Sequence, residues 1–301
     1  MGVWENDRET GTKAVAWLRR HGIPVRGHCL VWPGKTNLPK DVVALLDQPE
    51  ALRKSITSHI ADEVGAFRGQ LTEWDVLNEP FTNTDVQRVL GDGAMLDWFR
   101  DTHEADPAPH LFINDYSILE SGGRDAPHQD HYFKTIQLLL DGGAPVQGIG
   151  IQGHFSEDLT AIPRLIEILD RFGSFGLPIQ ITEFDINTYD ESVAADYTRD
   201  FLTAMFSHPS ISGIIVWGFL EKRHWIPAAA FYRADWTLRP AGEMWKQLTQ
   251  KTWWTDTTAQ TDAAGRTTVR GFLGDYEVRV KSTTATATIT REGSRLDVQI
   301  R

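Results

Sequence analysis

The chain has 301 residues, of which 41% are hydrophobic and 24% are charged, and this composition is typical of a globular protein with one large domain or two smaller ones. Its net charge of −11 argues against binding to nucleic acid or to anionic membranes, because both would repel the protein. The single cysteine, Cys29, excludes an intrachain disulfide and a zinc site built from several cysteines.

Six short apolar segments predict β-strands. Several of them are apolar on both faces, as are parallel strands that helices cover. They occupy residues 24–32, 71–79, 110–117, 146–154, 178–186 and 211–219. None of these segments, and no other run of the chain, approaches the roughly 18 apolar residues that a transmembrane helix needs.

Helical patterns lie between the predicted strands. In residues 10–22, "TGTKAVAWLRRHG", the side chains of Ala14, Trp17 and Leu18 lie on one stripe. A second pattern, residues 161–173, repeats apolar positions at helical spacing and ends at a glycine, as helices often do. The alternation of strands and helices predicts βαβ units around a parallel sheet, either as a barrel or as a doubly wound sheet.

After about residue 250 the pattern changes to alternation with period two. The segments "TTVRGF", "DYEVRVKS", "TATATITRE" and "RLDVQIR" contain no helical pattern, and "REGSR" is typical of a hairpin turn. We therefore expect a barrel domain over residues 1–250 and a small antiparallel β extension over residues 251–301. The extension is too short to hold a large core alone, so we expect it to pack on the barrel.

Two glutamates stand at strand ends. Glu79 closes the apolar segment "WDVLNE", and Pro80 then stops strand pairing because it has no N–H to donate. Glu183 takes a similar place in "QITEFDI". In a parallel barrel all strand C-termini open on the face that holds the active site, so the two carboxylates can converge there, as a retaining glycosidase requires. The alternative is that they are two unrelated residues at the rim.

Polar and aromatic side chains occupy the other strand ends. They are Asn78, Asn114, Tyr116, Gln152, His154, Trp217 and Trp225. Taken singly, each has a simpler explanation; His154 could be a structural histidine and Trp217 a core side chain. So many polar and aromatic strand ends are hard to explain by packing alone.

Asp75 lies on the same strand face as Glu79, because side chains alternate along "WDVLNE". If Glu79 points to the mouth of the barrel, Asp75 lies deeper and needs a partner, since a buried carboxylate is costly without one. Arg26 and His28 on the preceding strand are the candidates.

Two motifs point to other functions, and we set both aside. "GIGIQG", residues 148–153, matches a dinucleotide-binding pattern, but its isoleucines indicate a strand where such a site needs a turn before a helix. "HQDH", residues 128–131, offers two histidines on a predicted helix, and we expect a solvated helical face there in place of a metal site.

The ordered motifs "RGHCLVW", "WDVLNEPF", "FINDY", "GIGIQGH", "ITEFDI" and "VWGF" followed by "HW" resemble glycoside hydrolase family 10, the endo-β-1,4-xylanases, over about residues 1–245. The resemblance implies a TIM-type (β/α) barrel, cleavage of xylan with retention of configuration, Glu79 as the acid/base and Glu183 as the nucleophile. It also implies no cofactor and no metal. The residues that would bind the sugar are His28, Asn78, Asn114, Tyr116, Gln152, His154, Trp217 and Trp225.

The chain departs from the family pattern in three ways, one of which is Glu221, where many members carry aspartate. Six strands are recognisable where a closed barrel needs eight, so the first two strands are either absent or outside this sequence. Pro33 stands where the family carries a histidine that contacts the sugar. A barrel that binds polysaccharide with little or no hydrolysis is therefore the alternative function, and a hydrolase of another β-glucan is a third.

The incomplete barrel and the polymeric substrate lead to two further expectations. Because an open barrel leaves unpaired edge strands, we expect the β extension or a second copy of the chain to cover the gap. Xylan is a polymer, so we expect a secreted, extracellular protein. Because "MGVWENDRET" lacks the apolar stretch of a signal peptide, an export signal would then lie outside this sequence; the alternative is a cytoplasmic protein.

Overall fold

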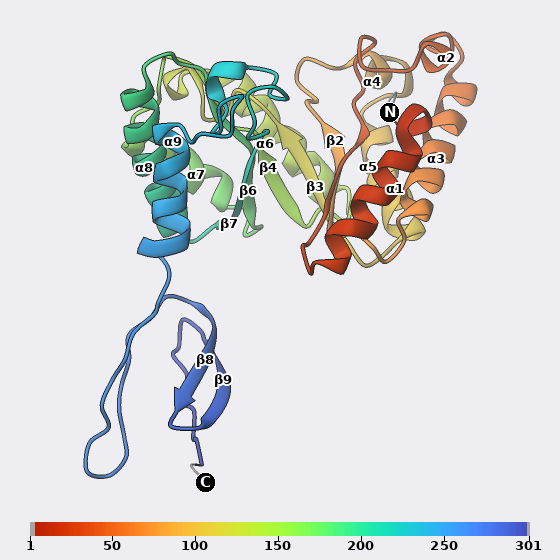
Figure 1. Cartoon of the computed structure of the whole chain (residues 1–301). Coiled ribbons are helices and arrows are strands. Elements are labelled where there is room, and N and C mark those ends of the chain that lie inside the picture. The colour runs from red at the N-terminus through yellow and green to blue at the C-terminus, as the bar shows by residue number, and fades with distance from the viewer. Residues whose placement is uncertain (1–3, 300–301) are drawn as a thin grey trace.

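The computed structural model describes residues 4–299 and contains a parallel sheet curled into a half-barrel with helices on its outer side (Figure 1). Six strands run in the order β1-β2-β3-β4-β6-β7, and the short β5 pairs with the far end of β6. Their bounds are β1 Arg26–Val31, β2 Glu73–Asn78, β3 His110–Asp115, β4 Gly148–Ile151, β5 His154–Phe155, β6 Ile179–Ile186 and β7 Ile211–Val216. All six predicted strands and the incomplete TIM-type barrel are confirmed.

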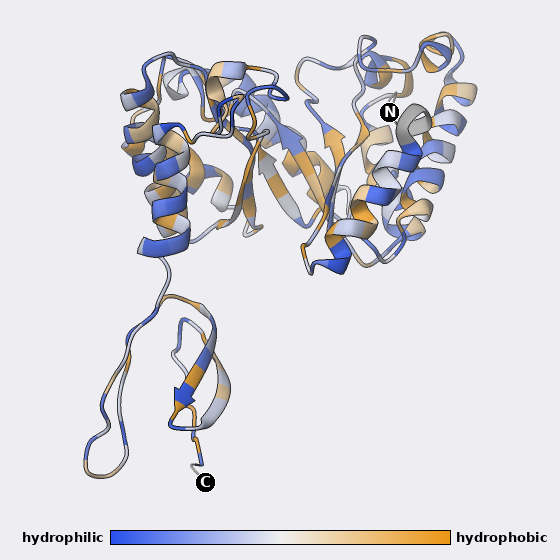
Figure 2. Ribbon diagram, in the orientation of Figure 1, coloured by the Kyte–Doolittle hydropathy of each residue, from blue (hydrophilic) through white to orange (hydrophobic). Residues whose placement is uncertain are grey.

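The helices follow the strands as βαβ units require. They are α1 Trp4–Arg20, α2 Lys40–Val43, α3 Pro49–Ala66, α4 Asp85–Leu90, α5 Gly93–Ala105, α6 Ala126–Asp141, α7 Ile162–Gly173, α8 Glu191–Ser207 and α9 Pro240–Gln247, with short turns at Ser121–Gly123, Pro227–Ala229 and Leu248–Thr252. The core lies between the sheet and these helices, and orange stretches along the strands mark it in Figure 2. Within residues 4–299 no helix is long and apolar enough to cross a membrane.

The α1 helix turns a different face to the core from the one that we predicted. Val15 is buried, whereas Ala14 is exposed and Trp17 is 50% exposed. Gly11, Val15 and Leu18 form the inward stripe, because residues four and three positions apart share a helix face. The Trp17 ring stacks on His21, which directly follows the helix, with 4.0 Å between ring centroids. The α7 prediction, with its end at Gly173, is confirmed.

Both edges of the half-barrel are open in the part of the chain that the structure describes. There, β1 pairs only with β2, and β7 pairs only with β6. The outer strand β7 is half-exposed, and Ile215 on it is 39% exposed. Over residues 251–299, the β extension forms no ladder with either edge, so this part of it does not cover the gap by strand pairing. Cover by a second copy remains a prediction.

The β extension forms two strands, β8 Gly274–Val280 and β9 Thr283–Ile289, joined by a two-residue turn. Four strands were predicted, and the other two segments contain none among the residues described, which end at 299. The prediction of four strands was wrong because alternation with period two also occurs in an extended chain without a pairing partner. Figure 1 shows the hairpin below the half-barrel, at the end of the chain that leaves α9. Phe272 contacts Phe206 of α8, and packing of the whole extension on the barrel remains a prediction.

Candidate active site

The register of the parallel strands brings the predicted residues to one end of the sheet. Asn78 pairs in register with Asn114 of β3, and Asn114 pairs with Gly150 of β4. Glu79 directly follows β2, and its N–H donates to the Asn114 carbonyl at 2.9 Å. The φ angle of Glu79 is +55°, a left-handed conformation that non-glycine residues rarely adopt and that is often found at functional sites.

Three side chains hold the Glu79 carboxylate. Trp32 Nε1 donates to Oε2 at 3.1 Å, and Asn83 Nδ2 donates to the same oxygen at 3.2 Å. Gln152 Nε2, from the end of β4, donates to Oε1 at 2.9 Å. Glu79 itself is half-buried. Its carboxylate is therefore oriented from three sides.

Glu183 lies inside β6, which continues three residues beyond it, so our placement of this residue at the strand end was wrong. Its side chain is nevertheless directed into the same site. Asn114 Nδ2 donates to Oε1 at 2.9 Å, and His154 Nε2 lies 3.1 Å from Oε2. Asn114 Nδ2 also donates to Asn78 Oδ1 at 2.9 Å, so this amide joins the environments of the two glutamates.

His154 lies between two carboxylates. Its Nε2 faces Glu183, and its Nδ1 lies 3.0 Å from Oδ1 of Asp185. Burial alone would lower the pKa of His154, but the two carboxylates outweigh it and raise the pKa to about 10. The imidazole is therefore a cation at neutral pH. It stabilises the negative charge on the buried Glu183.

Two tryptophans border the site. Trp217 lies edge-on to the rings of His28 and His154, with centroid distances of 5.3 and 6.3 Å. Trp225 is 60% exposed, and its Nε1 donates to Asp185 Oδ2 at 2.8 Å. An exposed indole that is fixed by a hydrogen bond is suited to stacking on the apolar face of a sugar ring.

The hypothesis that Asp75 is buried with Arg26 and His28 is confirmed. Asp75 is 1% exposed; Arg26 Nε donates to its Oδ2 at 3.0 Å, and His28 Nδ1 lies 3.0 Å from the same oxygen. Burial would raise the pKa of Asp75, but the Arg26 charge and the His28 hydrogen bond lower it. Burial would likewise lower the pKa of His28, but the hydrogen bond and charge of Asp75 raise it. Arg26 also donates to Glu73 at 2.9 Å.

An Arg26→Met variant is expected to lose about 3–5 kcal/mol of unfolding free energy at neutral pH, because two carboxylates in the barrel lose their cationic partner. The pKa of Asp75 is lowered below its ordinary value of 3.8, so the stabilisation is present above that pH and disappears as the pH falls through the folded pKa. The loss should therefore shrink below about pH 4. Urea unfolding at both pH values measures it.

Arg53→Met is the matched control, since Arg53 and Asp97 form a partly exposed pair at 3.0 Å that is worth about 0.2–1 kcal/mol. Equal losses in the two variants would contradict the buried network.

Tyr116 reaches the loop that follows Glu79, because its hydroxyl donates to Thr82 Oγ1 at 3.1 Å. The "HQDH" histidines lie beside this loop on α6. His128 is 1% exposed and Nε2 lies 3.1 Å from Asp115 Oδ1, so the expectation of a solvated face was wrong for this residue. Burial raises the pKa of Asp115 to about 6. Among residues 4–299 no group of three or more His, Cys, Asp or Glu could hold a metal ion.

The glycines of "GIGIQG" are a structural feature of the sheet. Gly148 and Gly150 lie within β4, and Gly153 lies at the bend before β5. A Cβ on Gly148 would meet the Phe112 ring at 2.1 Å. Close packing between strands therefore accounts for glycine at Gly148, and the turn that a dinucleotide site needs is not formed here.

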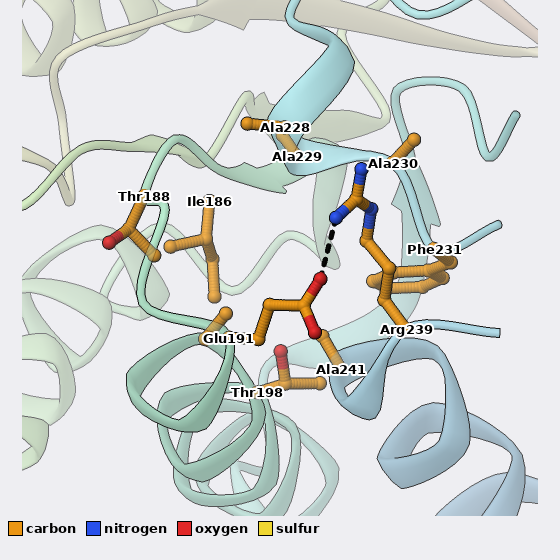
Figure 3. Close-up of a pocket in the computed structure, with 11 residues that line it drawn as sticks. Ile186, Thr188, Glu191, Thr198, Ala228, Ala229, Ala230, Phe231, Arg239 and Ala241 are labelled. Atoms are coloured by element: carbon orange, nitrogen blue, oxygen red, sulfur yellow. Dashed lines mark hydrogen bonds and ion pairs between the residues drawn. The ribbon is translucent and has the colours of Figure 1, made fainter. Parts of the chain in front are cut away.

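A narrow pocket beside the site shows how the loop that carries the tryptophans is attached. In Figure 3, Glu191 at the start of α8 points to Arg239 across this pocket. Glu191 accepts hydrogen bonds from Arg239 at 2.6 Å and from Arg233 at 2.6 Å. Glu191 and Arg239 both line the pocket, and the ion pairs of Glu191 attach the segment after β7 to α8.

Three further residues belong to the site and were not predicted from the sequence. Trp32 and Asn83 contact Glu79, and Asp185 contacts both His154 and Trp225. Alternation along "ITEFDI" could have identified Asp185, because it places this residue on the same face as Glu183. Trp32 ends the predicted strand 24–32 and could have been identified as another aromatic strand end, whereas Asn83 lies in a loop, where periodicity carries no information.

The sequence profile of glycosyl hydrolase family 10 matches residues 6–248. Anti-sigma-I factor RsgI6 of Acetivibrio thermocellus is 34% identical over 88% of this chain and 34% of that protein. Endo-1,4-beta-xylanase 1 of Arabidopsis thaliana is 30% identical over 91% of this chain and 28% of that protein. The chain thus spans about a third of the length of these curated relatives.

Among solved structures, xylanase 10B from Thermotoga petrophila in complex with xylobiose superposes with a TM-score of 0.72 at 27% identity, over 80% of this chain and 78% of that one. Native xylanase 10B from Thermotoga maritima superposes with a TM-score of 0.73 at 26% identity, over 80% of this chain and 79% of that one. The half-barrel therefore corresponds to most of the fold of these enzymes.

Proposed function

Because the chain belongs to glycosyl hydrolase family 10, we propose that it is an endo-β-1,4-xylanase that cleaves xylan or xylo-oligosaccharides with retention of configuration. One observation carries the proposal most directly. Gln152 and His154, two residues apart at the end of β4, contact Glu79 and Glu183 respectively. The two carboxylates are thus oriented toward one site by the same short segment.

The proposed reaction has two steps. Ionised Glu183 attacks the anomeric carbon while Glu79 donates its proton to the leaving glycosidic oxygen, and a covalent glycosyl-enzyme forms. Glu79, now ionised, then takes a proton from a water molecule, whose oxygen attacks the same carbon and releases Glu183. The Asn114 amide and the His154 cation both contact the Glu183 carboxylate and orient it for the first step. Trp217 and Trp225 are proposed to stack on xylose rings beside the cleaved bond, and His28, Asn78 and Tyr116 to contact them.

The alternative is a barrel that binds polysaccharide without efficient hydrolysis. The open edges at β1 and β7 favour it, and so does a relative named as an anti-sigma factor in place of an enzyme. Pro33, where the family carries a sugar-contacting histidine, also favours it. An extracellular location, expected from a polymeric substrate, remains part of the xylanase proposal.

Reducing-sugar release from xylan, cellulose and mixed-linkage β-glucan tests the proposal, with affinity electrophoresis in the same polymers. Release from xylan, with the β-anomer as the first product in NMR spectra, is the expected result. Retardation by xylan without release would support the binding alternative. Faster release from a glucan would assign a different substrate.

A further inference from the structure

We propose that Glu120 is a positioning residue, which holds the segment Gln152–His154 in the geometry that serves both Glu79 and Glu183. The inference rests on the proposed function for its kinetic consequence, but its structural part can be tested separately. Glu120 lies on the loop between β3 and α6, is 5% exposed, and belongs to no strand.

The bend between β4 and β5 creates two N–H groups without a strand acceptor. The Gln152 N–H still donates to the Asp115 carbonyl at 3.0 Å, but β3 ends at Asp115. The carbonyls of Gln152 and Gly153 both accept from β6. The N–H groups of Gly153 and His154 face the other side, and burying them without partners would be costly.

Glu120 supplies the missing acceptor. Its Oε1 accepts from the N–H groups of Gly153 and His154, each at 2.9 Å, and its Oε2 accepts from the Leu119 N–H at 2.9 Å. Gly153 has a φ angle of +92°, which only glycine adopts readily. The bend is therefore fixed by the glycine conformation and by the Glu120 carboxylate, which accepts from both N–H groups of the bend and from the Leu119 N–H.

The chemistry of the site calls for a carboxylate. All three groups that face Glu120 are donors, so both side-chain oxygens must accept. In glutamine, the side-chain NH₂ would face one of these backbone N–H groups, and two donors cannot form a hydrogen bond with each other. The hydrogen bonds and the charge of His154 compensate in part for the burial of the carboxylate.

The position of the bend decides the geometry at both glutamates. The Gln152 and His154 side chains leave the chain on either side of Gly153, and each makes its contact within 3.1 Å. A shift of the segment by a few tenths of an ångström would lengthen both contacts at once. Displacements of about 1 Å in such groups can reduce a rate by roughly a hundredfold.

The test compares Glu120→Gln with Asp106→Asn. Asp106 is a matched control, because it is 3% exposed and also accepts two backbone N–H groups, from Gly69 and Ala108, at the opposite end of β3. In Glu120→Gln we expect kcat on xylo-oligosaccharides to fall by about tenfold or more with KM changed by less than about threefold. In Asp106→Asn both constants should stay at the parental values. Equal kinetics in Glu120→Gln and the parent would overturn the proposal.

A spectroscopic measurement separates this inference from the proposed function. His154 has a pKa of about 10 because Asp185 and Glu183 hold it; His224 also faces Asp185. We expect the His154 ring, followed by NMR, to titrate at lower pH in Glu120→Gln and at the parental pH in Asp106→Asn. An unchanged titration in Glu120→Gln would overturn the proposal even in a protein without xylanase activity.

Amide exchange in the unmodified chain provides a test that does not depend on the folding of a variant. The Gly153 and His154 amides lack a strand acceptor but should exchange as slowly as those of β4, because Glu120 binds them. Fast exchange of these two amides in a protein whose β4 amides are protected would contradict the proposal that Glu120 holds this segment.

Discussion

A Glu183→Gln variant is expected to lose xylan hydrolysis by about four orders of magnitude or more, because the amide has no ionised oxygen to attack the anomeric carbon. The loss should appear in kcat. Binding should persist, since Asn114 can still donate to the amide oxygen and the aromatic side chains are unchanged. Reducing-sugar assays measure the first effect and affinity electrophoresis in xylan the second.

Glu167→Gln is the matched control, because Glu167 lies on α7 and pairs with Arg164 at 65% side-chain exposure. It should retain parental activity. Substantial hydrolysis by Glu183→Gln would show that another group is the nucleophile.

A Glu79→Ala variant is expected to show a loss that depends on the leaving group. Xylan needs protonation of its glycosidic oxygen, so its hydrolysis should fall by about 10²–10⁴-fold. An aryl xylobioside with an acidic phenol needs little protonation, and formation of its glycosyl-enzyme should be much less affected. Steady-state kinetics on both substrates measure the difference.

Azide provides a second readout for Glu79→Ala. It attacks the glycosyl-enzyme without a general base, so it should restore turnover of the aryl substrate and yield a β-xylobiosyl azide, because the second displacement restores the β configuration. Equal losses on the two substrates, with no effect of azide, would exclude Glu79 as the acid/base.

The strands and the two glutamates could be predicted from local sequence. An apolar segment that stops at proline, as "WDVLNEP" does, predicts a buried strand and a carboxylate at its end without knowledge of the neighbours. Alternation then placed Asp75 below Glu79. The need of a buried charge for a partner led to Arg26 and His28, which the structure brings to 3.0 Å from Asp75.

Contacts made by loops could not be predicted in this way. Asn83 and Glu120 contact the site from segments whose path depends on the packing of several strands. The prediction of the buried face of α1 was wrong for the same reason. Two stripes of this helix are apolar, and the neighbouring elements decide that Val15 is buried and Trp17 is exposed. The burial of His128 could not be predicted for the same reason, because it depends on α6 placing this residue against Asp115.

The positions of the strands along the chain, the chemical groups at their ends and the family to which the chain belongs could therefore be predicted from the sequence alone. These features follow from periodicity and residue type, which act over a few neighbouring positions. The three-dimensional packing was needed to show that Gln152 and His154 reach different glutamates, and that Glu120 accepts from the bend between them. Those contacts join residues far apart in the chain, and their distances depend on strand register and on the acceptors that each backbone N–H finds.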